Sequence, residues 1–405
     1  MIITKQCRRL LDTCFLQRMI IRNESFSPKT AIILSKLTRF EYEQIRNHDM
    51  DDDELRTFLI DRGSDYHQLK QRHLRHVEIM SHVKEQLDLR GIKTQVIQRA
   101  NYSSDSLKGV DLVLSAGGDG TFLLGASKIK NKSLPLIGVN TDPERSEGYL
   151  CLPRKYSLNF GKALDKLLST DVRWLHRKRI RITMSGKHAN DQPVQLLEQQ
   201  LSSPELRFSE HIKEHELHHH QSNVAKDLPS RVLPILSLND IFIGESLSAR
   251  VSYYELSIDG APKVEQKCSG ITICTGTGSS SWHFNINSLQ AQDIRHVLKI
   301  TQSKTGLDIP YKDKDLVKCI YSKFNKSLYF SPTCPKMAFT VRDPVHTGIY
   351  RVIEPRGFAT RVKIRSKMWD ACLVIDGGVS FQFNDGAEAL LEMHDEDMLK
   401  TAMLD

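Results

Sequence analysis

The chain has 405 residues, 40 % of them hydrophobic and 26 % charged, which is the composition of an ordinary globular protein of roughly two or three domains. Its formal net charge of +8 suits anionic ligands such as nucleotides. No stripe of lysine and arginine interleaved with aromatics stands out, which argues against a nucleic-acid partner. No apolar run is long enough for membrane insertion.

Residues 1–25 form a basic segment that contains few acids. Hydrophobic side chains lie among the basic ones at roughly helical spacing. This pattern is typical of a mitochondrial transit peptide, and equally of a frayed basic N-terminus, so both interpretations stay open on this segment alone. The basic residues are Lys5, Arg8, Arg9, Arg18 and Arg22, and the acids are Asp12 and Glu24.

Residues 26–168 alternate between strand-like and helix-like segments. Continuous apolar runs such as Ala31–Leu34 and Val110–Leu114 are typical of strands buried on both faces, and the periodic segments between them are typical of helices. This alternation predicts an α/β domain with a doubly wound parallel sheet. The predicted elements are strand 31–34, helices 52–60 and 68–90, strands 94–96 and 110–114, helix 122–127 and strand 134–139.

Residues 169–385 have a different texture, with short alternating segments rich in β-branched side chains. They predict a mostly antiparallel, β-rich C-terminal domain, followed by a C-terminal segment at 386–405. Within this domain, residues 186–230 are polar and loop-like, and we expect a poorly ordered insertion. The strand candidates are 178–184, 250–258, 270–274, 360–364 and 371–375.

The cysteines and histidines predict no metal site. None of the eight cysteines forms a Cys-x-x-Cys pair, which argues against a disulfide framework and a cysteine zinc site. Five histidines fall in the polar insertion, where a solvated low-complexity loop is the favoured interpretation. They are His211, His215, His218, His219 and His220.

The strongest chemical signal is the loop Gly117–Gly118–Asp119–Gly120–Thr121, which directly follows the strand at 110–114. Ligands of open α/β sheets bind at the carboxyl ends of strands, where glycines let the backbone approach a phosphate. An acid inside a phosphate-facing loop suits a general base or a metal ligand. The alternative is that Asp119 only caps the following helix.

This loop resembles the signature of NAD kinases, of diacylglycerol and sphingosine kinases and, with serine last, of phosphofructokinases. It therefore indicates a kinase and leaves the acceptor open. Three further segments resemble the NAD kinases in the family's order: Leu136–Asn140, Asn239–Ile243 and Thr275–Trp282. Asn239 and Asp240 offer donors and acceptors for a ribose or adenine, although the pair alone would be read as a turn.

The resemblance extends to the site residues. It implies that Asp119 is the catalytic base and that Gly117, Gly118, Gly120 and Thr121 hold the phosphates of ATP. It also implies an NAD site made of Asn140, Asn239, Asp240, Lys267, Thr277, Gly278, Ser279 and Ser280.

Three departures from the common family pattern are visible. Ser269 stands where the family has an acid, Gly276 stands where it has proline, and residues 141–149 replace a Gly-x-Leu-Gly-Phe pattern. These changes resemble the divergent mitochondrial NAD kinases of animals, and this similarity favours the transit-peptide interpretation. In this interpretation Lys267 compensates for the missing acid.

The resemblance implies a fold of two domains, α/β and then β-rich, and an activity. The expected activity is transfer of a phosphate from ATP, with Mg²⁺, to the 2′-hydroxyl of the adenosine ribose of NAD, giving NADP in the mitochondrial matrix. It also implies a homodimer. Two alternatives stay open, a lipid kinase that uses the same loop and a catalytically weak NAD-binding sensor.

Overall fold

The computed structural model describes residues 26–169, 172–186, 188–202, 229–345 and 354–404. The chain divides into two compact units. The N-terminal unit comprises the described residues of the ranges 19–177, 194–222 and 395–405, and the C-terminal unit those of 178–193 and 223–394. The predicted transit peptide and the five histidines of the insertion lie outside the described residues.

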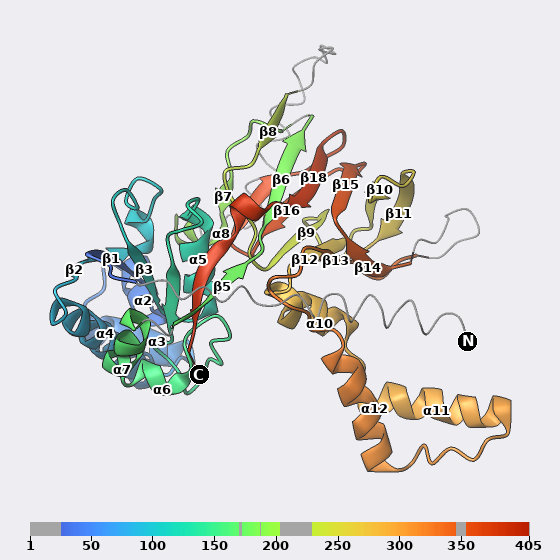
Figure 1. Ribbon diagram of the computed structural model, residues 1–405, viewed down its shortest axis with the longest axis horizontal. Helices are drawn as coiled ribbons and strands as arrows, with labels where there is room; N and C mark the ends of the chain where they lie inside the picture. Colours follow the sequence, from blue (N-terminus) through green and yellow to red (C-terminus); the bar gives the residue numbers. More distant parts are fainter. Residues whose placement is uncertain (1–25, 170–171, 187, 203–228, 346–353, 405) are drawn as a thin grey trace. The chain divides into compact units, whose positions relative to one another are not determined.

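A four-stranded parallel sheet, in the order β2-β1-β3-β4, forms the centre of the N-terminal unit (Figure 1). Its strands are β1 (Thr30–Ser35), β2 (Lys93–Gln98), β3 (Leu112–Ala116) and β4 (Leu136–Val139). All strands of a parallel sheet end at the same edge, so the segments that follow β1, β3 and β4 come together there.

Helices cover both faces of this sheet, as the continuous apolar runs predict. Ala31 and Ile33 of β1 pack in one hydrophobic cluster with α4 (Tyr66–Asp88) and α7 (Phe160–Leu168). The alternate residues Ile32 and Leu34 belong to a second cluster, which includes Leu124 of α5 (Asp119–Lys128). The doubly wound α/β architecture is therefore confirmed.

Smaller elements complete the N-terminal unit. The helix predicted at 52–60 begins at Asp52, because the side chain of Asp51 accepts hydrogen bonds from the N–H groups of Asp53 and Glu54. The remaining elements are α2 (Arg39–Arg46), α3 (Asp52–Asp61), η1 (Arg99–Asn101), α6 (Arg154–Ser157), β5 (Arg173–Arg177), β7 (Val194–Gln195), α8 (Leu196–Ser202), η3 (Asp395–Asp397) and β19 (Leu399–Met403).

The final strand β19 returns to the N-terminal unit and pairs antiparallel with β5. Leu399 is fully buried, and the Lys400 ammonium lies 4.5 Å from the ring centroid of Trp174. The N-terminal unit therefore includes Arg173–Arg177 and Leu399–Met403, which the predicted boundaries at 168 and 386 had placed elsewhere. Sequence patterns locate strands, but the long-range pairing that assigns them to a unit leaves no local signal.

Two antiparallel sheets form the C-terminal unit, as the alternating segments predict. One has the order β11-β10-β15-β18-β6-β8, and the other contains β14-β13-β12-β9-β16-β17. Both sheets contribute side chains to one large hydrophobic cluster, for example Tyr254 and Ile364 from the first and Ile243 and Leu373 from the second. The strands are β6 (Ile180–Ser185), β8 (Ser230–Val232), β9 (Asp240–Glu245), β10 (Ser252–Ile258), β11 (Val264–Cys268), β12 (Ile271–Cys274), β13 (Met337–Val341), β14 (Arg356–Ala359), β15 (Arg361–Ser366), β16 (Ala371–Ile375), β17 (Val379–Gln382) and β18 (Glu388–Met393).

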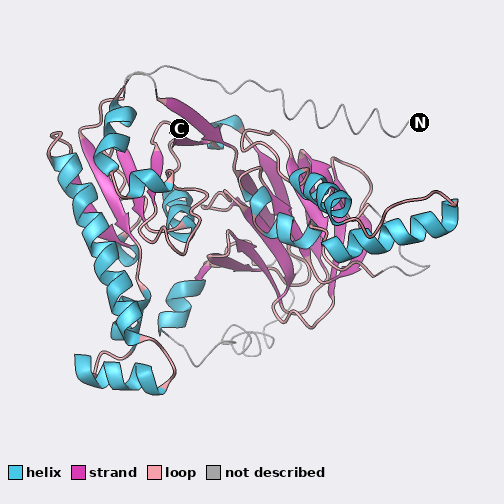
Figure 2. Cartoon of the chain, turned by 90° about the horizontal axis from the view of Figure 1, so that it is seen from below, coloured by secondary structure: helices cyan, strands magenta, loops and turns pink. Residues whose placement is uncertain are grey.

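Helices of the C-terminal unit lie between β12 and β13. The short turn η2 (Gly278–Ser280) leads into α10 (Trp282–Asn287), and then α11 (Ala291–Thr305) and α12 (Lys314–Lys326) form a pair. In Figures 1 and 2 this pair projects from the sheets of its own unit. The charged and polar residues around α11 hide its helical period, so the sequence pattern does not predict this helix.

The segment 186–230 differs in part from the expected poorly ordered loop. Its described residues include β7, α8 and β8, and β8 pairs with β6. The apolar positions Val194, Leu196 and Leu197 sit among glutamines and glutamates, and this mixed composition obscured the helix.

The remaining global predictions concern cysteines and membranes. The six cysteines within the described ranges are free thiols. Among the helices of the described residues, none combines the length and the apolarity that crossing a bilayer requires.

Candidate functional site

The glycine loop joins β3 to α5 at the carboxyl edge of the parallel sheet. The Gly117 N–H donates to the Val139 carbonyl of β4 at 3.0 Å, and the Lys36 N–H donates to the Ala116 carbonyl at 3.0 Å. The loop is therefore held between the ends of both neighbouring strands. This is the edge at which α/β sheets bind their ligands.

A side chain would meet different surroundings at each of the three glycines of the loop. A Cβ at Gly117 would lie 2.3 Å from Thr121 Oγ1, so packing excludes a side chain there. A Cβ at Gly118 would lie 3.3 Å from Ser146 Oγ. At Gly120 a Cβ would meet nothing within 4 Å, so no protein atom accounts for the missing side chain. Open space beside a helix N-terminus suits a bound anion.

Asp119 is the first residue of α5 and does not cap that helix, because the N-cap position is Gly118. Its carboxylate instead accepts hydrogen bonds from the N–H groups of Tyr149, at 3.2 Å, and Leu150, at 2.9 Å. Burial lowers the pKa of Arg177 to about 10, and the Asp119 carboxylate opposes that shift. Asp119 is thus an oriented, partly exposed carboxylate that faces a guanidinium.

The segment after β4 lies against the loop. Asn140 is buried, its Nδ2 donates to the Ser146 carbonyl at 2.8 Å and its Oδ1 accepts from the Asp142 N–H at 2.9 Å. Both ends of the amide are therefore used within the 140–148 turn. Asn140 therefore stabilises the conformation of the 140–148 turn, which lies beside Gly118.

A second group of predicted residues comes together in the C-terminal unit. The Thr275 N–H donates to the Asn239 carbonyl at 2.9 Å, and the Thr275 hydroxyl donates to the Leu238 carbonyl at 2.5 Å. The Nδ2 of Asn239 lies 3.4 Å from Ser281 Oγ. The turn before β9 and the loop after β12 therefore form one polar surface.

Glycines make this close approach possible. A Cβ at Gly278 would lie 2.2 Å from the Asn239 carbonyl oxygen, and one at Gly276 would lie 1.9 Å from the Ser331 carbonyl oxygen. The side chain of proline also begins with a Cβ, so the backbone at Ser331–Pro332 explains why glycine replaces the proline that the family has at 276.

Asp376 orders the turn that carries Asn239 and Asp240. Its carboxylate accepts from the N–H groups of Leu238, Asn239 and Asp240, at 2.9, 2.8 and 3.1 Å, and from the Ser237 hydroxyl at 2.7 Å. Asp376 itself adopts a left-handed backbone with a φ of 50°. No local sequence pattern signals this anchoring role.

Asp240 and Asn239 present polar atoms suited to a ligand. Burial raises the pKa of Asp240 to about 7, and the nearby charge of Asp376 adds to that shift. The buried Oδ1 of Asn239 has no hydrogen-bond partner among the described residues. A buried acceptor left unpaired is costly unless a ligand or water satisfies it.

The hydroxyl residues of the Thr275–Ser281 loop divide by role. The Ser279 hydroxyl donates to the Gly276 carbonyl at 2.7 Å and is buried, so it stabilises the loop from inside. Thr277 is also buried, whereas Ser280 is partly exposed. Trp282, at the end of the loop, is 49 % exposed and is therefore no core residue.

Lys267 lies apart from these residues. It belongs to β11, in the other sheet of the unit, and its ammonium lies 5.6 Å from the ring centroid of Tyr253. The structure therefore does not bring Lys267 together with Asn239 or Asp240. Ser269, which replaces the family's acid, donates its N–H to the Arg342 carbonyl.

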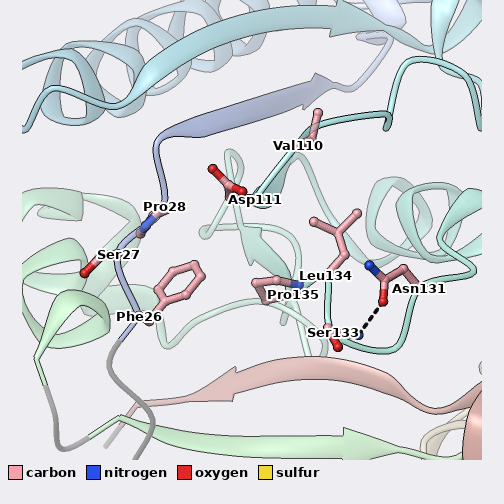
Figure 3. A pocket seen from close by; sticks show the side chains of 9 residues that line it. All are labelled: Phe26, Ser27, Pro28, Val110, Asp111, Asn131, Ser133, Leu134 and Pro135. Atoms are coloured by element: carbon pink, nitrogen blue, oxygen red, sulfur yellow. Dashed lines mark hydrogen bonds between the residues drawn. The ribbon is translucent and has the colours of Figure 1, made fainter.

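The described residues contain no protein metal cluster, and a hollow in the N-terminal unit lies away from the glycine loop. Among the described residues, no group of three or more metal-ligating side chains comes together. A shallow hollow of about 290 Å³ lies between Phe26–Pro28, Val110–Asp111 and Asn131–Pro135 (Figure 3). These segments precede β1, β3 and β4, so the hollow lies at the amino edge of the sheet, opposite the loop.

Comparisons with known proteins agree with these motifs. A family model described as "ATP-NAD kinase N-terminal domain" matches residues 54–172. The chain is 41 % identical over 382 residues to "NAD kinase 2, mitochondrial" of Rattus norvegicus, covering 94 % of this chain and 88 % of that protein. Proteins of the same name from Xenopus tropicalis and Homo sapiens are also 41 % identical, and 94 % of this chain matches 92 % and 85 % of them.

Proposed function

The chain belongs to the NAD kinase family, and on that premise we propose that ATP gives its terminal phosphate to the 2′-hydroxyl of the adenosine ribose of NAD. The protein is a kinase that phosphorylates NAD to NADP. The names of its relatives favour NAD over the lipid acceptor that the glycine loop alone leaves open.

Asp119 is the proposed general base, and its geometry carries this assignment. Its carboxylate sits at the start of α5 within the glycine loop, oriented by two backbone N–H groups rather than engaged as a helix cap. From there it accepts the proton of the attacking hydroxyl as the bond to phosphorus forms. Arg177 nearby supplies positive charge for the developing transition state.

The donor phosphates bind, in this proposal, to the N–H groups of Gly118 and Gly120 and to Thr121. Gly117 serves the same loop differently, because its N–H is engaged by the Val139 carbonyl and its missing side chain leaves room for Thr121. The open space at Gly120 supports this, because protein packing does not fill it. Mg²⁺ would be bound together with ATP and would screen the charge of the phosphates, and Asp119 is the nearby carboxylate that would hold it.

NAD binds, in this proposal, to the polar surface made by Asn239, Asp240, Thr277 and Ser280, with Gly278 and Ser279 shaping the loop. The unpaired Oδ1 of Asn239 suits a donor such as the adenine amine, and the Asp240 carboxylate suits ribose hydroxyls. We leave Lys267 out of this surface, because its ammonium lies over Tyr253.

One assay tests the activity and its base together. The purified protein is incubated with MgATP and either NAD or diacylglycerol, and NADP and phosphatidic acid are measured. We expect NADP only. Asp119→Asn should lower kcat by roughly 100- to 10,000-fold, the usual contribution of a general base, with little change in NAD binding. Full activity in this variant would refute the base, and a phosphorylated lipid would refute the acceptor.

Location and assembly are the last parts of the proposal. The names of the matched proteins indicate a mitochondrial protein, and we propose the matrix as its compartment. From the resemblance to the family we propose a homodimer as its assembly. The basic segment at 1–25 supports import. Fractionation of mitochondria and sedimentation of the purified protein test the two proposals, and a membrane-bound pool or a stable monomer would contradict them.

A further inference from the structure

Transfer of a phosphate requires positive charge beside the phosphate that moves. The loop Gly117–Thr121 carries no lysine or arginine, unlike the phosphate loop of P-loop enzymes, which ends in Gly-Lys-Ser/Thr. The lysine of α5 is Lys128, at the far end of that helix. A cation for the donor phosphates must therefore come from another element, as Arg177 of β5 does beside Asp119.

Lys36 lies where such a cation is needed. It directly follows β1, the strand beside β3, and its N–H donates to the carbonyl of Ala116, the residue before the loop. A Cβ added to Gly117 would approach the Cβ of Lys36 to 3.0 Å. The lysine backbone therefore borders the glycine loop itself, at the carboxyl edge of the sheet.

Two carboxylates influence the charge of Lys36, but neither forms a salt bridge with it. Burial lowers the pKa of its ammonium, while the carboxylates of Asp142 and Glu41 raise it. Yet across the part of the chain that the structure describes, the ammonium forms no salt bridge within 4.0 Å. Glu41 is engaged elsewhere, because it accepts from the N–H and the hydroxyl of Thr38.

A neutral histidine, His76, connects the two segments around Lys36 through hydrogen bonds. His76 is 1 % exposed, and its ring nitrogens lie 2.9 Å from Ser35 Oγ and 3.0 Å from Thr141 Oγ1. It thereby ties the residue before Lys36 to the residue before Asp142. Burial lowers the pKa of His76 to about 4, so the imidazole adds no competing charge at neutral pH.

We propose that Lys36 binds the terminal phosphate of the nucleoside triphosphate and stabilises it as it passes to NAD. The ammonium keeps its proton throughout. The bond between the terminal phosphorus and the bridging oxygen breaks, the bond to the ribose oxygen forms, and Asp119 receives the hydroxyl proton. This assignment rests on the proposed function and adds a residue from β1 to the loop of β3.

Steady-state kinetics of the full chain test the role, with Lys36→Ala, Lys36→Arg and a matched control, Lys29→Ala. Lys29 lies exposed just before the other end of β1, so its removal deletes the same charge far from the loop. We expect Lys36→Ala to lower kcat/KM for ATP by roughly 10- to 100-fold, as for a lost charged hydrogen bond. The KM for NAD and the melting temperature should stay unchanged, Lys36→Arg should recover part of the loss, and Lys29→Ala should match the parent protein.

Calorimetry separates phosphate binding from a merely structural role. Inorganic tripolyphosphate should bind Lys36→Ala more weakly than the parent protein, whereas AMP should bind both equally. Unchanged tripolyphosphate binding, a defect confined to the KM for NAD, or full rescue by adding Asp142→Asn would each overturn the proposal. If the parent protein makes no NADP, the proposed function fails. The Lys36 assignment is then decided by the same tripolyphosphate comparison.

Discussion

Glycine occupies three functional loop positions here for different physical reasons. At Gly117 and Gly276 a side chain would collide with atoms of the protein, whereas at Gly120 it would enter open space. A sequence shows the glycines but not what surrounds them. A small side chain at Gly120 should therefore affect ligand binding and leave the stability of the fold unchanged.

Gly120→Ala should therefore separate binding from stability. Alanine is about 1 kcal/mol better than glycine within a helix, so the melting temperature should stay equal or rise. The KM for ATP should rise at least roughly tenfold, because the new methyl group occupies the space proposed for phosphate. Ser127→Ala, at the other end of α5, is the control. An unchanged KM for ATP would mean that the phosphates lie elsewhere.

Asp240 predicts a pH dependence near neutrality. Its pKa of about 7 lies far above the usual range of a carboxyl group, so the side chain is neutral below pH 7 and ionised above it. Ribose hydroxyls donate best to the ionised form. NAD affinity should therefore fall as the pH drops from about 8 to about 6, by up to roughly tenfold for each unit below 7.

Titration calorimetry with NAD across this range measures the effect. Asp240→Asn cannot ionise, so its NAD affinity should be lower above pH 7 and nearly independent of pH. If the variant kept the slope of the parent protein, another group would be responsible.

At the scale of elements, the loop after β12 depends on contacts that are distant in sequence. Gly276→Ala places a Cβ against the backbone at Ser331–Pro332, which cannot move as a flexible side chain would. We expect a loss of about 3 kcal/mol, at the upper end for overpacking, and a fall in melting temperature of roughly 10 °C. Gly378→Ala is the control, because its Cβ would meet only the Asp376 carbonyl oxygen, at 4.0 Å. Equal melting of both variants would contradict this account.

The elements that the sequence predicted well are those with a local pattern. The buried runs at 31–34 and 110–114 became β1 and β3, and the Gly117–Thr121 loop follows the second of them as expected. The anchoring of Asp240 by Asp376 had no such signal, because the two residues are 136 positions apart. Lys36 was missed for the same reason, since only the parallel pairing of β1 with β3 brings it to the loop.

At the scale of the whole molecule, the chain leaves the N-terminal unit at Arg177, rejoins it with β7 and α8, and comes back for the last time at 395. Leu399 is fully buried in that unit although the C-terminal unit separates it from β5 in sequence. The Arg177 Nε still donates to the hydroxyl of Thr401, 224 positions away. The stability of the N-terminal unit, which carries the glycine loop, therefore depends on residues near 400.

Leu399→Ala should destabilise the N-terminal unit by about 2–5 kcal/mol, the usual range for truncating a buried leucine. Hydrogen exchange followed by mass spectrometry should show faster exchange in β5 and β19, with the C-terminal sheets unaffected. Leu307→Ala is the control, because Leu307 is 62 % exposed. Exchange that speeds up only in the C-terminal sheets would contradict the assignment of β19 to the N-terminal unit.

The return of β19 also sets an order of events during synthesis. When the ribosome has made β5, the strand that will pair with it does not yet exist, and residues 178–394 must emerge first. While the whole β-rich unit is translated, the N-terminal unit of the nascent chain therefore already contains the Gly117–Thr121 loop, but its strand β5 has no partner. A truncated polypeptide that ends before β19 contains every residue proposed for the chemistry, yet lacks the strand that pairs with β5 in the N-terminal unit.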